Sequence, residues 1–248
     1  VGMSSKKDRI TTEILRYKLM AVIDESAITV ARISGSVIVT EGNDFNFALA
    51  NAAGQVLMVG PYIVAHAAAL DGVITHVVRE YCDNPGINPG DMFLTNNPYL
   101  GVTHQNDVAL ICPIFHEEKL IAWCGSIAHQ VDVGGPTLGM NVKADSIYAE
   151  ALPIEPVKIV EGGRIRRDLE REYLIRSRLP FLNALDLRGQ VAANNVAAAK
   201  FLAVVQEYGC DVVLNALDDL VDQAALQFGA RLRELADGVR EAITYIEG

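Results

Sequence analysis

The chain has little positive charge. Its 248 residues include 21 Lys and Arg against 31 Asp and Glu, so the formal net charge is -10. The short basic run Arg164, Arg166 and Arg167 is too small to change this balance. Binding to a nucleic-acid backbone needs a broad basic face, and acidic membrane surfaces attract basic segments for the same electrostatic reason. The charge balance therefore argues against nucleic acids and membranes as partners.

Cysteine is also scarce. No pair has the CxxC spacing of a metal or redox motif, and three of the four cysteines lie in apolar stretches. Because cysteine is among the most often buried residue types, we expect buried free thiols, which suits a reducing compartment. The four residues are Cys82, Cys112, Cys124 and Cys210.

Segments that direct secretion, span a membrane or bind nucleotide phosphates are missing. Residues 1–7 contain no apolar run like that of a signal peptide. The most apolar stretch, residues 56–78, is broken by Gly60, Pro61, His66 and Asp71, so a membrane span is not expected. Neither GxxxxGKS/T nor a GxGxxG between a strand and a helix occurs. We therefore expect a cytoplasmic protein that does not itself bind ATP.

Apolar residues make up half of the chain, which is ample for a buried core and leaves surface for another chain to cover. The spacing of apolar residues predicts helices over residues 11–30, with Thr11 as the N-cap, and over residues 65–81. Extended runs are predicted at residues 36–40, 44–50, 55–59, 92–95, 107–115 and 119–129. Asn51–Gly54 and His116–Glu118 have the composition of hairpin turns.

The C-terminal third is predicted to be helical. After a loop-rich segment at residues 131–156, helices are expected over residues 168–178, 183–208 and 211–246, with breaks at Pro180 and Gly209. The order of elements predicts an α+β fold with an N-terminal helix, a mixed β-sheet region with hairpins and a helical C-terminal part. We expect an α+β domain over residues 1–163 and a helical region over residues 164–248.

Three residues at one end of the predicted long hairpin can hold a metal. A hairpin centred near Glu117 places Asp107 opposite residue 128 or 129, and His104 lies in the loop that enters the first strand. Two imidazoles and one carboxylate suit Zn²⁺, Mn²⁺ or Fe²⁺ and leave positions open for water or substrate. His104 must remain in the loop, since a strand cannot put residues three apart on one face. Alternatively, His104 and His129 are hydrogen-bonded loop residues and Asp107 caps a turn.

Two further residues are candidates for proton transfer. His66 begins a predicted helix and either touches substrate or simply caps that helix. Asp132 follows the long hairpin and either acts as a general base or caps the loop. Gly134 and Gly135 after it would let backbone amides approach an anion, although a GG pair alone is a weak signal.

A set of motifs in fixed order gives the chain a family resemblance from about residue 11 to residue 209. They are Asp44-Phe45, Asn51–Gly54, Val64-Ala65-His66, Asn88–Asp91, Asn97-Pro98-Tyr99 leading to Thr103-His104, Asp107, Ala128-His129, Asp132–Gly135, Pro156–Gly163 and Gln190–Asn194. With these the chain resembles the hydantoinase B family, which includes the B subunits of N-methylhydantoinases, the C-terminal part of 5-oxoprolinase and the alpha subunit of acetone carboxylase.

The resemblance implies a partner related to hydantoinase A, which uses ATP to phosphorylate a substrate oxygen. The B-type chain then handles the activated intermediate, either by ring-opening hydrolysis of a cyclic amide or by carboxylation of a ketone. It also implies that His104, Asp107 and His129 are metal ligands, as in the acetone carboxylase alpha subunit. Asn97, Tyr99, Gly134 and Gly135 are expected to contact substrate. Zn²⁺ and Mn²⁺ are the expected metals, with Fe²⁺ as a further option.

Two positions depart from the family pattern. Asn97 stands where hydantoinase-type members often have Asp, and Gln130 stands where they often have a second His. Both differences remove a candidate acid, base or ligand. The chain is also shorter than the usual subunits of this family. Cyclic amide hydrolysis is the favoured function, ketone carboxylation is the first alternative, and a non-catalytic scaffold subunit of a hetero-oligomer is the second.

Overall fold

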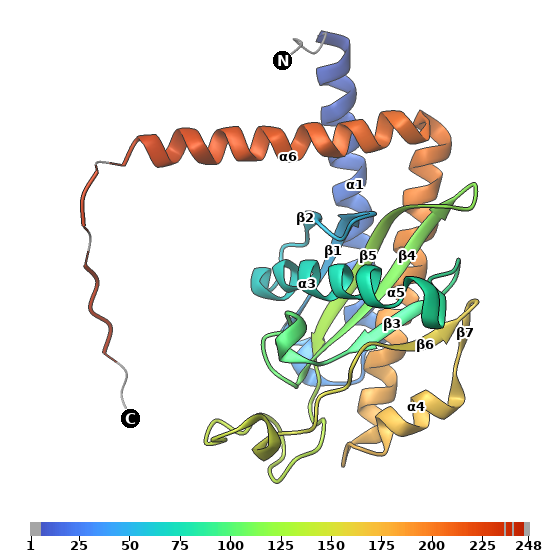
Figure 1. The fold of residues 1–248 in the computed structure, drawn as a ribbon, viewed down its shortest axis with the longest axis vertical. Coiled ribbons are helices and arrows are strands. Elements are labelled where there is room, and N and C mark those ends of the chain that lie inside the picture. Colours follow the sequence, from blue (N-terminus) through green and yellow to red (C-terminus); the bar gives the residue numbers. More distant parts are fainter. Residues whose placement is uncertain (1–5, 236, 240, 246–248) are drawn as a thin grey trace.

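A seven-stranded antiparallel sheet with the order β2-β1-β5-β4-β3-β6-β7 forms the centre of the fold (Figure 1). The computed structural model describes residues 6–235, 237–239 and 241–245. The strands are β1 (Phe45–Asn51), β2 (Val56–Val59), β3 (Met92–Thr95), β4 (Asp107–His116), β5 (Lys119–His129), β6 (Val157–Glu161) and β7 (Arg164–Ile165). Most of residues 1–7, for which no signal peptide is predicted, lies outside the described residues.

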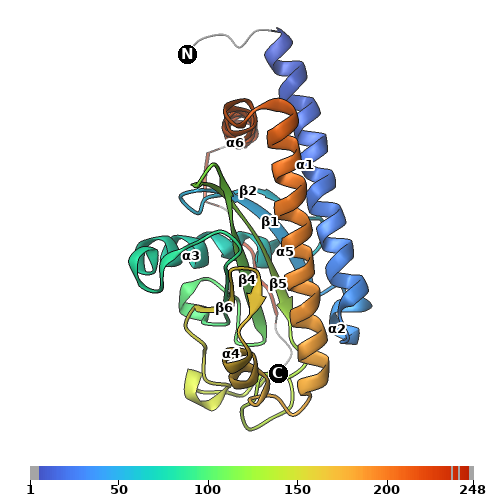
Figure 2. The same ribbon diagram turned by 90° about the vertical axis from the view of Figure 1, so that its right-hand side faces the viewer.

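Helices cover both faces of the sheet. They are α1 (Lys6–Ile33), α2 (Val37–Thr40), α3 (Val64–Glu80), α4 (Arg167–Leu174), α5 (Pro180–Tyr208) and α6 (Cys210–Arg233). Figure 2 shows α1 and α5 side by side on one face and α3 on the other. The predicted α+β fold is confirmed, and none of the described helices has the length and hydropathy needed to cross a bilayer.

Alternation along the strands divides the apolar core between the two faces. On β1, Phe45, Phe47 and Leu49 face α1 and α5, whereas Ala48 and Ala50 face α3. This alternation follows from the two-residue period of a strand that is buried on both faces. The larger core also takes side chains from α5 and α6, so residues before and after 164 pack together. The predicted division into two domains at that position stays a prediction.

Several predicted boundaries are wrong, each for a local reason. The predicted strand at residues 36–40 is instead helix α2 with Ser36 as its N-cap, because the Ser36 side chain accepts a hydrogen bond from the Val39 amide. Thr11 lies inside α1, which already begins at Lys6. Pro180 starts α5 where the sequence predicts a break, since proline fits the first turn of a helix.

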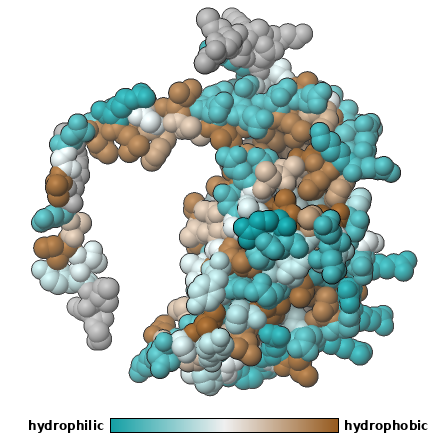
Figure 3. Space-filling model, in the orientation of Figure 1, coloured by the Kyte–Doolittle hydropathy of each residue, from teal (hydrophilic) through white to brown (hydrophobic). Residues whose placement is uncertain are grey.

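The C-terminal helix is shorter than predicted. Helix α6 ends at Arg233, and the described residues after it are not helical; Ile246, the predicted end, lies outside the described residues. Figures 1 and 3 show α6 projecting from the body with apolar surface along it. Leu217 near its start is buried, whereas Leu226 and Phe228 are exposed.

All four cysteines are free thiols, as predicted, but they are not all buried. Cys112 and Cys124 are buried opposite each other on β4 and β5. Burial raises the pKa of the Cys124 thiol and keeps it protonated. Cys82 is exposed and Cys210 is partly exposed.

Candidate metal centre

Four segments converge at one end of the sheet. Strand β4 begins at Asp107, strand β5 ends at His129, and the two residues are paired, which is one of the two registers that the sequence predicts. His104 lies in the turn before β4, where the amide of Asp107 donates to its carbonyl. His66 lies in the first turn of α3 on the neighbouring face. The structure therefore brings together the three predicted metal ligands and one predicted proton-transfer residue.

Asp107 is the centre of this cluster, and its side chain is fully buried. Nδ1 of His129 donates to its Oδ1 at 3.2 Å. Its Oδ2 lies 3.3 Å from Nε2 of His66 and 3.6 Å from Nε2 of His104. The His104 and His129 rings meet edge to face with their centroids 4.9 Å apart. One carboxylate thus faces three imidazoles.

Charge and burial set the protonation of the cluster. Burial by itself raises the pKa of the Asp107 carboxyl, but the nearby imidazoles of His129 and His66 outweigh it and hold this pKa well below its ordinary value. Burial also lowers the pKa of His104, and the nearby imidazoles of His129 and His66 add to the shift. An ionised carboxylate beside a neutral imidazole is the protonation state in which both groups can bind a metal.

The donor set fits a divalent metal. His104, Asp107 and His129 each offer a ligand atom, and these atoms lie within 4.8 Å of one another. Within the described part of the chain, Oδ2 of Asp107 is buried and accepts no well-aligned hydrogen bond. Buried polar atoms are rarely left without a partner, so Oδ2 is a free position for a ligand such as a metal ion. Nitrogen and oxygen donors suit Zn²⁺, Mn²⁺ or Fe²⁺.

Asp44 is a member of the cluster that sequence reasoning does not reveal. Its Oδ1 lies 3.6 Å from Nε2 of His66, and its Oδ2 lies 3.7 Å from Nδ1 of His129. Asp44 reaches this place because β1 pairs with β5 and its carbonyl accepts the amide of His129. Counting residues outward from a hairpin turn cannot predict this pairing, since β1 and β5 are far apart in sequence. The only signal is the Asp44-Phe45 match to the family pattern.

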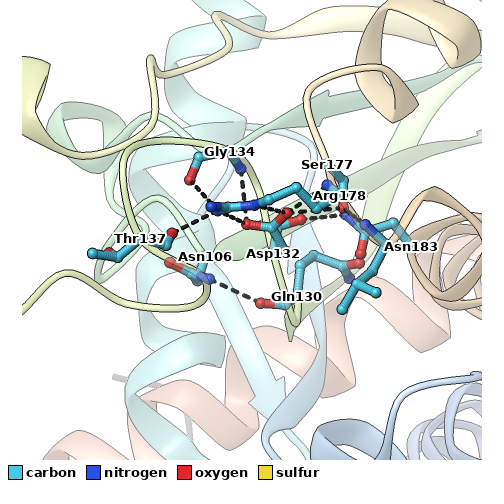
Figure 4. Close-up of polar contacts among 9 residues, drawn as sticks. Asn106, Gln130, Asp132, Gly134, Thr137, Ser177, Arg178 and Asn183 are labelled. Carbon is cyan, nitrogen blue, oxygen red and sulfur yellow. Dashed lines mark hydrogen bonds and ion pairs between the residues drawn. The ribbon is translucent and has the colours of Figure 1, made fainter.

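Asp132, the second predicted proton-transfer residue, lies in a different network (Figure 4). Its Oδ2 accepts from the Arg178 amide at 2.6 Å and from Arg178 Nε at 3.0 Å, and its Oδ1 accepts from the Gly134 amide at 3.3 Å. The Arg178 guanidinium also donates to the Thr137 carbonyl. Although burial raises it, hydrogen bonding from Arg178 and Gly134 lowers the pKa of Asp132 overall. Asp132 thus ties the loop after β5 to the start of α5.

The predicted substrate-binding residues shape the loops beside the cluster. Oδ1 of Asn97 accepts the amide of Tyr99, and its Nδ2 donates to Glu155 at 2.7 Å. The Tyr99 side chain is 81% exposed. Gly134 and Gly135 adopt positive φ angles of 102° and 84°, and the Gly134 amide is taken by Asp132. Their contact with substrate stays a prediction.

The sequence profile of the Hydantoinase B/oxoprolinase family matches residues 8–248. The chain belongs to this family. It is 29% identical to the caprolactamase subunit beta of Pseudomonas jessenii over 242 residues, which cover 97% of this chain and 41% of that subunit.

Two solved structures share the fold. The ATP-dependent caprolactamase from Pseudomonas jessenii superposes with a TM-score of 0.85 at 27% identity, over 96% of this chain and 40% of the caprolactamase chain. A nucleotide-free acetone carboxylase, from work on ATP-dependent acetone carboxylation, superposes with a TM-score of 0.86 at 26% identity, over 91% of this chain and 30% of that one. This member of the Hydantoinase B/oxoprolinase family therefore spans less than half the length of these relatives.

Replacing Asp132 by Asn tests the role of the Arg178 contact. The lowered pKa of Asp132 means that its carboxylate stabilises the folded protein above the ordinary Asp value near 4, and that this contribution is lost as the pH falls further. Asp132→Asn is expected to lower the free energy of unfolding by about 1–3 kcal/mol at pH 7, less if solvent screens the half-exposed guanidinium. Urea denaturation should show the two proteins converging as the pH drops below about 4. A difference that stays constant with pH would contradict this account.

Proposed function

We propose that this chain is the B-type subunit of an ATP-dependent enzyme and that it acts on an activated cyclic amide. A hydantoinase A-like partner would use ATP to phosphorylate the carbonyl oxygen of the substrate, and the intermediate would then reach the cluster around Asp107. The observation that carries the proposal is the set of His104, Asp107 and His129 donor atoms within 4.8 Å of one another. The chain belongs to the Hydantoinase B/oxoprolinase family, and the two solved structures that share its fold come from ATP-dependent enzymes. Both facts support a catalytic role for this set of residues.

In the proposed site, His104, Asp107 and His129 hold a divalent metal, with Zn²⁺ and Mn²⁺ preferred and Fe²⁺ as a further option. When bound there, such a metal polarises a carbonyl or activates a water. The buried Asp107 carboxylate holds its imidazole neighbours in place through contacts of 3.2–3.6 Å. The loop of residues 131–156 begins two residues after His129.

We assign proton transfer to His66. Its Nε2 lies 3.3 Å from Oδ2 of Asp107 and 3.6 Å from Oδ1 of Asp44, so an imidazolium formed there has two carboxylates as counterions. Asp44 is 38% exposed, which gives the pair a route to solvent or substrate. Asp132 is a weaker candidate, because both of its carboxylate oxygens are already engaged by Arg178.

Ring-opening hydrolysis is preferred to carboxylation. The caprolactamase subunit beta matches nearly the whole chain in sequence, and the residues around Asp44 and Gly134-Gly135 resemble hydantoinase chains. Ketone carboxylation is the second candidate, favoured by the superposition on acetone carboxylase with a TM-score of 0.86.

Purification of the native complex, followed by a screen of ATP hydrolysis against hydantoin, 5-oxoproline, lactams and ketones with bicarbonate, tests the proposal. We expect ATP turnover that depends on a cyclic amide. His104→Ala should abolish product formation in a complex that still assembles, because this variant removes one ligand. His76→Ala is the matched control, since His76 lies on α3, outside the cluster, against the Tyr81 ring. Full activity of the His104→Ala complex would instead make this chain a scaffold subunit.

A further inference from the structure

The three histidines of the cluster lie at the end of a strand or outside the strands. His66 is in the first turn of α3, His104 is in the turn before β4, and His129 is the last residue of β5. Hydrogen bonding within a sheet fixes residues inside the strands but leaves their ends free to fray. The His129 amide donates to the Asp44 carbonyl, but each of the three backbones needs a further contact to keep one arrangement. In each case a buried asparagine side chain provides it.

Asn106 holds the end of β5. Its Nδ2 donates to the Gln130 carbonyl at 2.9 Å, and the Gln130 amide donates back to the Asn106 carbonyl at 2.7 Å (Figure 4). Asn106 precedes Asp107 and Gln130 follows His129, so this reciprocal pair extends the hairpin by one step beyond its two functional residues. The Asn106 side chain is buried.

Asn96 holds the turn that carries His104. Its Nδ2 donates to the Gln105 carbonyl at 2.7 Å, and its Oδ1 accepts the Ile154 amide at 2.7 Å. The amide group therefore joins the His104 turn to the end of the loop of residues 131–156, with one hydrogen bond from its nitrogen and one to its oxygen. Asn96 follows β3 directly and is also buried, so the anchor is the sheet itself.

Asn46 holds the start of α3. Its Nδ2 donates to the Ile63 carbonyl at 2.9 Å and to the Gly60 carbonyl at 3.2 Å. The same Ile63 carbonyl accepts the His66 amide, so Asn46 and His66 share one acceptor at the first turn of the helix. Gly60 must lack a side chain here, because a Cβ would collide with Oδ1 of Asn46. Asn46 lies on β1, two residues after Asp44.

Apart from their contacts with the Asp107 and Asp44 carboxylates, the rings of His66 and His104 have little support. Metal-binding histidines usually donate their second ring nitrogen to a carbonyl or carboxylate, and this bond orients the ring. Among the described residues, Nδ1 of His66 and Nδ1 of His104 are buried without such a partner. Beyond their contacts with Asp107, the orientation of these rings must then come from the backbone that carries them.

We propose that Asn46, Asn96 and Asn106 are positioning residues of the metal centre, each fixing the backbone of one histidine-bearing segment so that three imidazoles converge on Asp107. The inference rests on the proposed function, since it concerns the same site. None of the three amide groups acts on substrate. Each binds a backbone carbonyl near one histidine. Asn106 binds at Gln130 beside His129, and Asn96 binds at Gln105 beside His104. Asn46 binds at Ile63, three residues before His66.

Zinc affinity of single alanine variants tests the proposal. Asn96→Ala, Asn106→Ala and Asn46→Ala are each expected to weaken Zn²⁺ binding about 10–100-fold, the range found when outer-shell partners are removed. The dissociation constant is measured by competition with a colorimetric chelator. The visible spectrum of the Co²⁺-loaded proteins should show a distorted site, and thermal unfolding without metal reports the fold separately.

Asn194→Ala is the matched control. Asn194 is a fully buried asparagine whose Nδ2 donates to the Leu110 carbonyl on β4 at 3.1 Å, in the core and not at the strand end. Its loss should lower the thermal midpoint like the others and leave zinc affinity unchanged.

Equal zinc affinity in the control and in the Asn96 and Asn106 variants would overturn the inference alone. Failure of the wild-type chain to bind zinc would overturn the metal site as well. Because the three asparagines are replaced in separate variants, the remaining two still test the proposal if one variant does not fold.

Discussion

Replacing Asp107 by Asn is expected to abolish tight metal binding while the chain still folds. Asparagine keeps the volume of the side chain but removes the only carboxylate among the three predicted ligands. It also places amide hydrogens where Oδ2 now faces His66 and His104 at 3.3 and 3.6 Å. The loss of affinity should exceed about 100-fold, the upper end of the cost of removing an outer-shell partner. Elemental analysis after dialysis and competition with a chelator measure it.

Asp186→Asn is the control for a buried aspartate outside the cluster. Asp186 lies on α5, and its Oδ1 accepts the amides of Gly35 and Ser36 at 2.8 and 3.1 Å. Its replacement should lower the free energy of unfolding and leave metal content at the wild-type level. If Asp107→Asn retained one metal per chain with unchanged affinity, the assignment of His104, Asp107 and His129 would be wrong. The cluster would then be a hydrogen-bonded junction between strand ends.

The local part of this site can be predicted from sequence. A hairpin with a short turn allows few registers, so the sequence predicts Asp107 opposite residue 128 or 129. A β-bulge between Ile114 and Phe115 decides between the two, because the turn pair His116–Lys119 alone would place Asp107 opposite Ala128. His104 also stays out of the strand, as predicted, since it lies in a turn before β4. In both cases the residues concerned are joined by one short element, and short elements have few possible geometries.

The non-local part cannot be predicted in this way. Asp44 joins the cluster through the pairing of β1 with β5, and Asn46 and Asn96 reach their carbonyls across 14–17 and 9 residues. No periodicity in the sequence marks which strands will pair or which asparagine will find a backbone acceptor. Capping chemistry also overrides the apolar pattern. Ser36 and Pro180 each start a helix where the sequence predicts a strand or a break.

The contact between α3 and the turn before His104 gives the second large effect. Gly72 on α3 faces the Leu100 carbonyl, and Gly101 faces the Ala69 carbonyl, each so closely that a Cβ would overlap the backbone oxygen. Gly101 also has a φ of 132°, which other residues rarely adopt. At these two glycines, the backbone of the helix that carries His66 thus meets the backbone of the turn that leads to His104. A side chain at either glycine would force the two segments apart.

Gly101→Ala is therefore expected to lower the free energy of unfolding by about 2–6 kcal/mol, because overpacking and backbone strain act together. Gly72→Ala causes the overlap without the backbone strain, so it should lower the free energy of unfolding by about 1–3 kcal/mol. Urea denaturation gives both values. Gly229→Ala in α6, where a Cβ meets no atom closer than 4.0 Å, should instead stabilise the helix by about 0.5–1 kcal/mol. A Gly101→Ala protein as stable as wild type would show that α3 can move away from the turn. His66 and His104 would then not be held at a fixed separation.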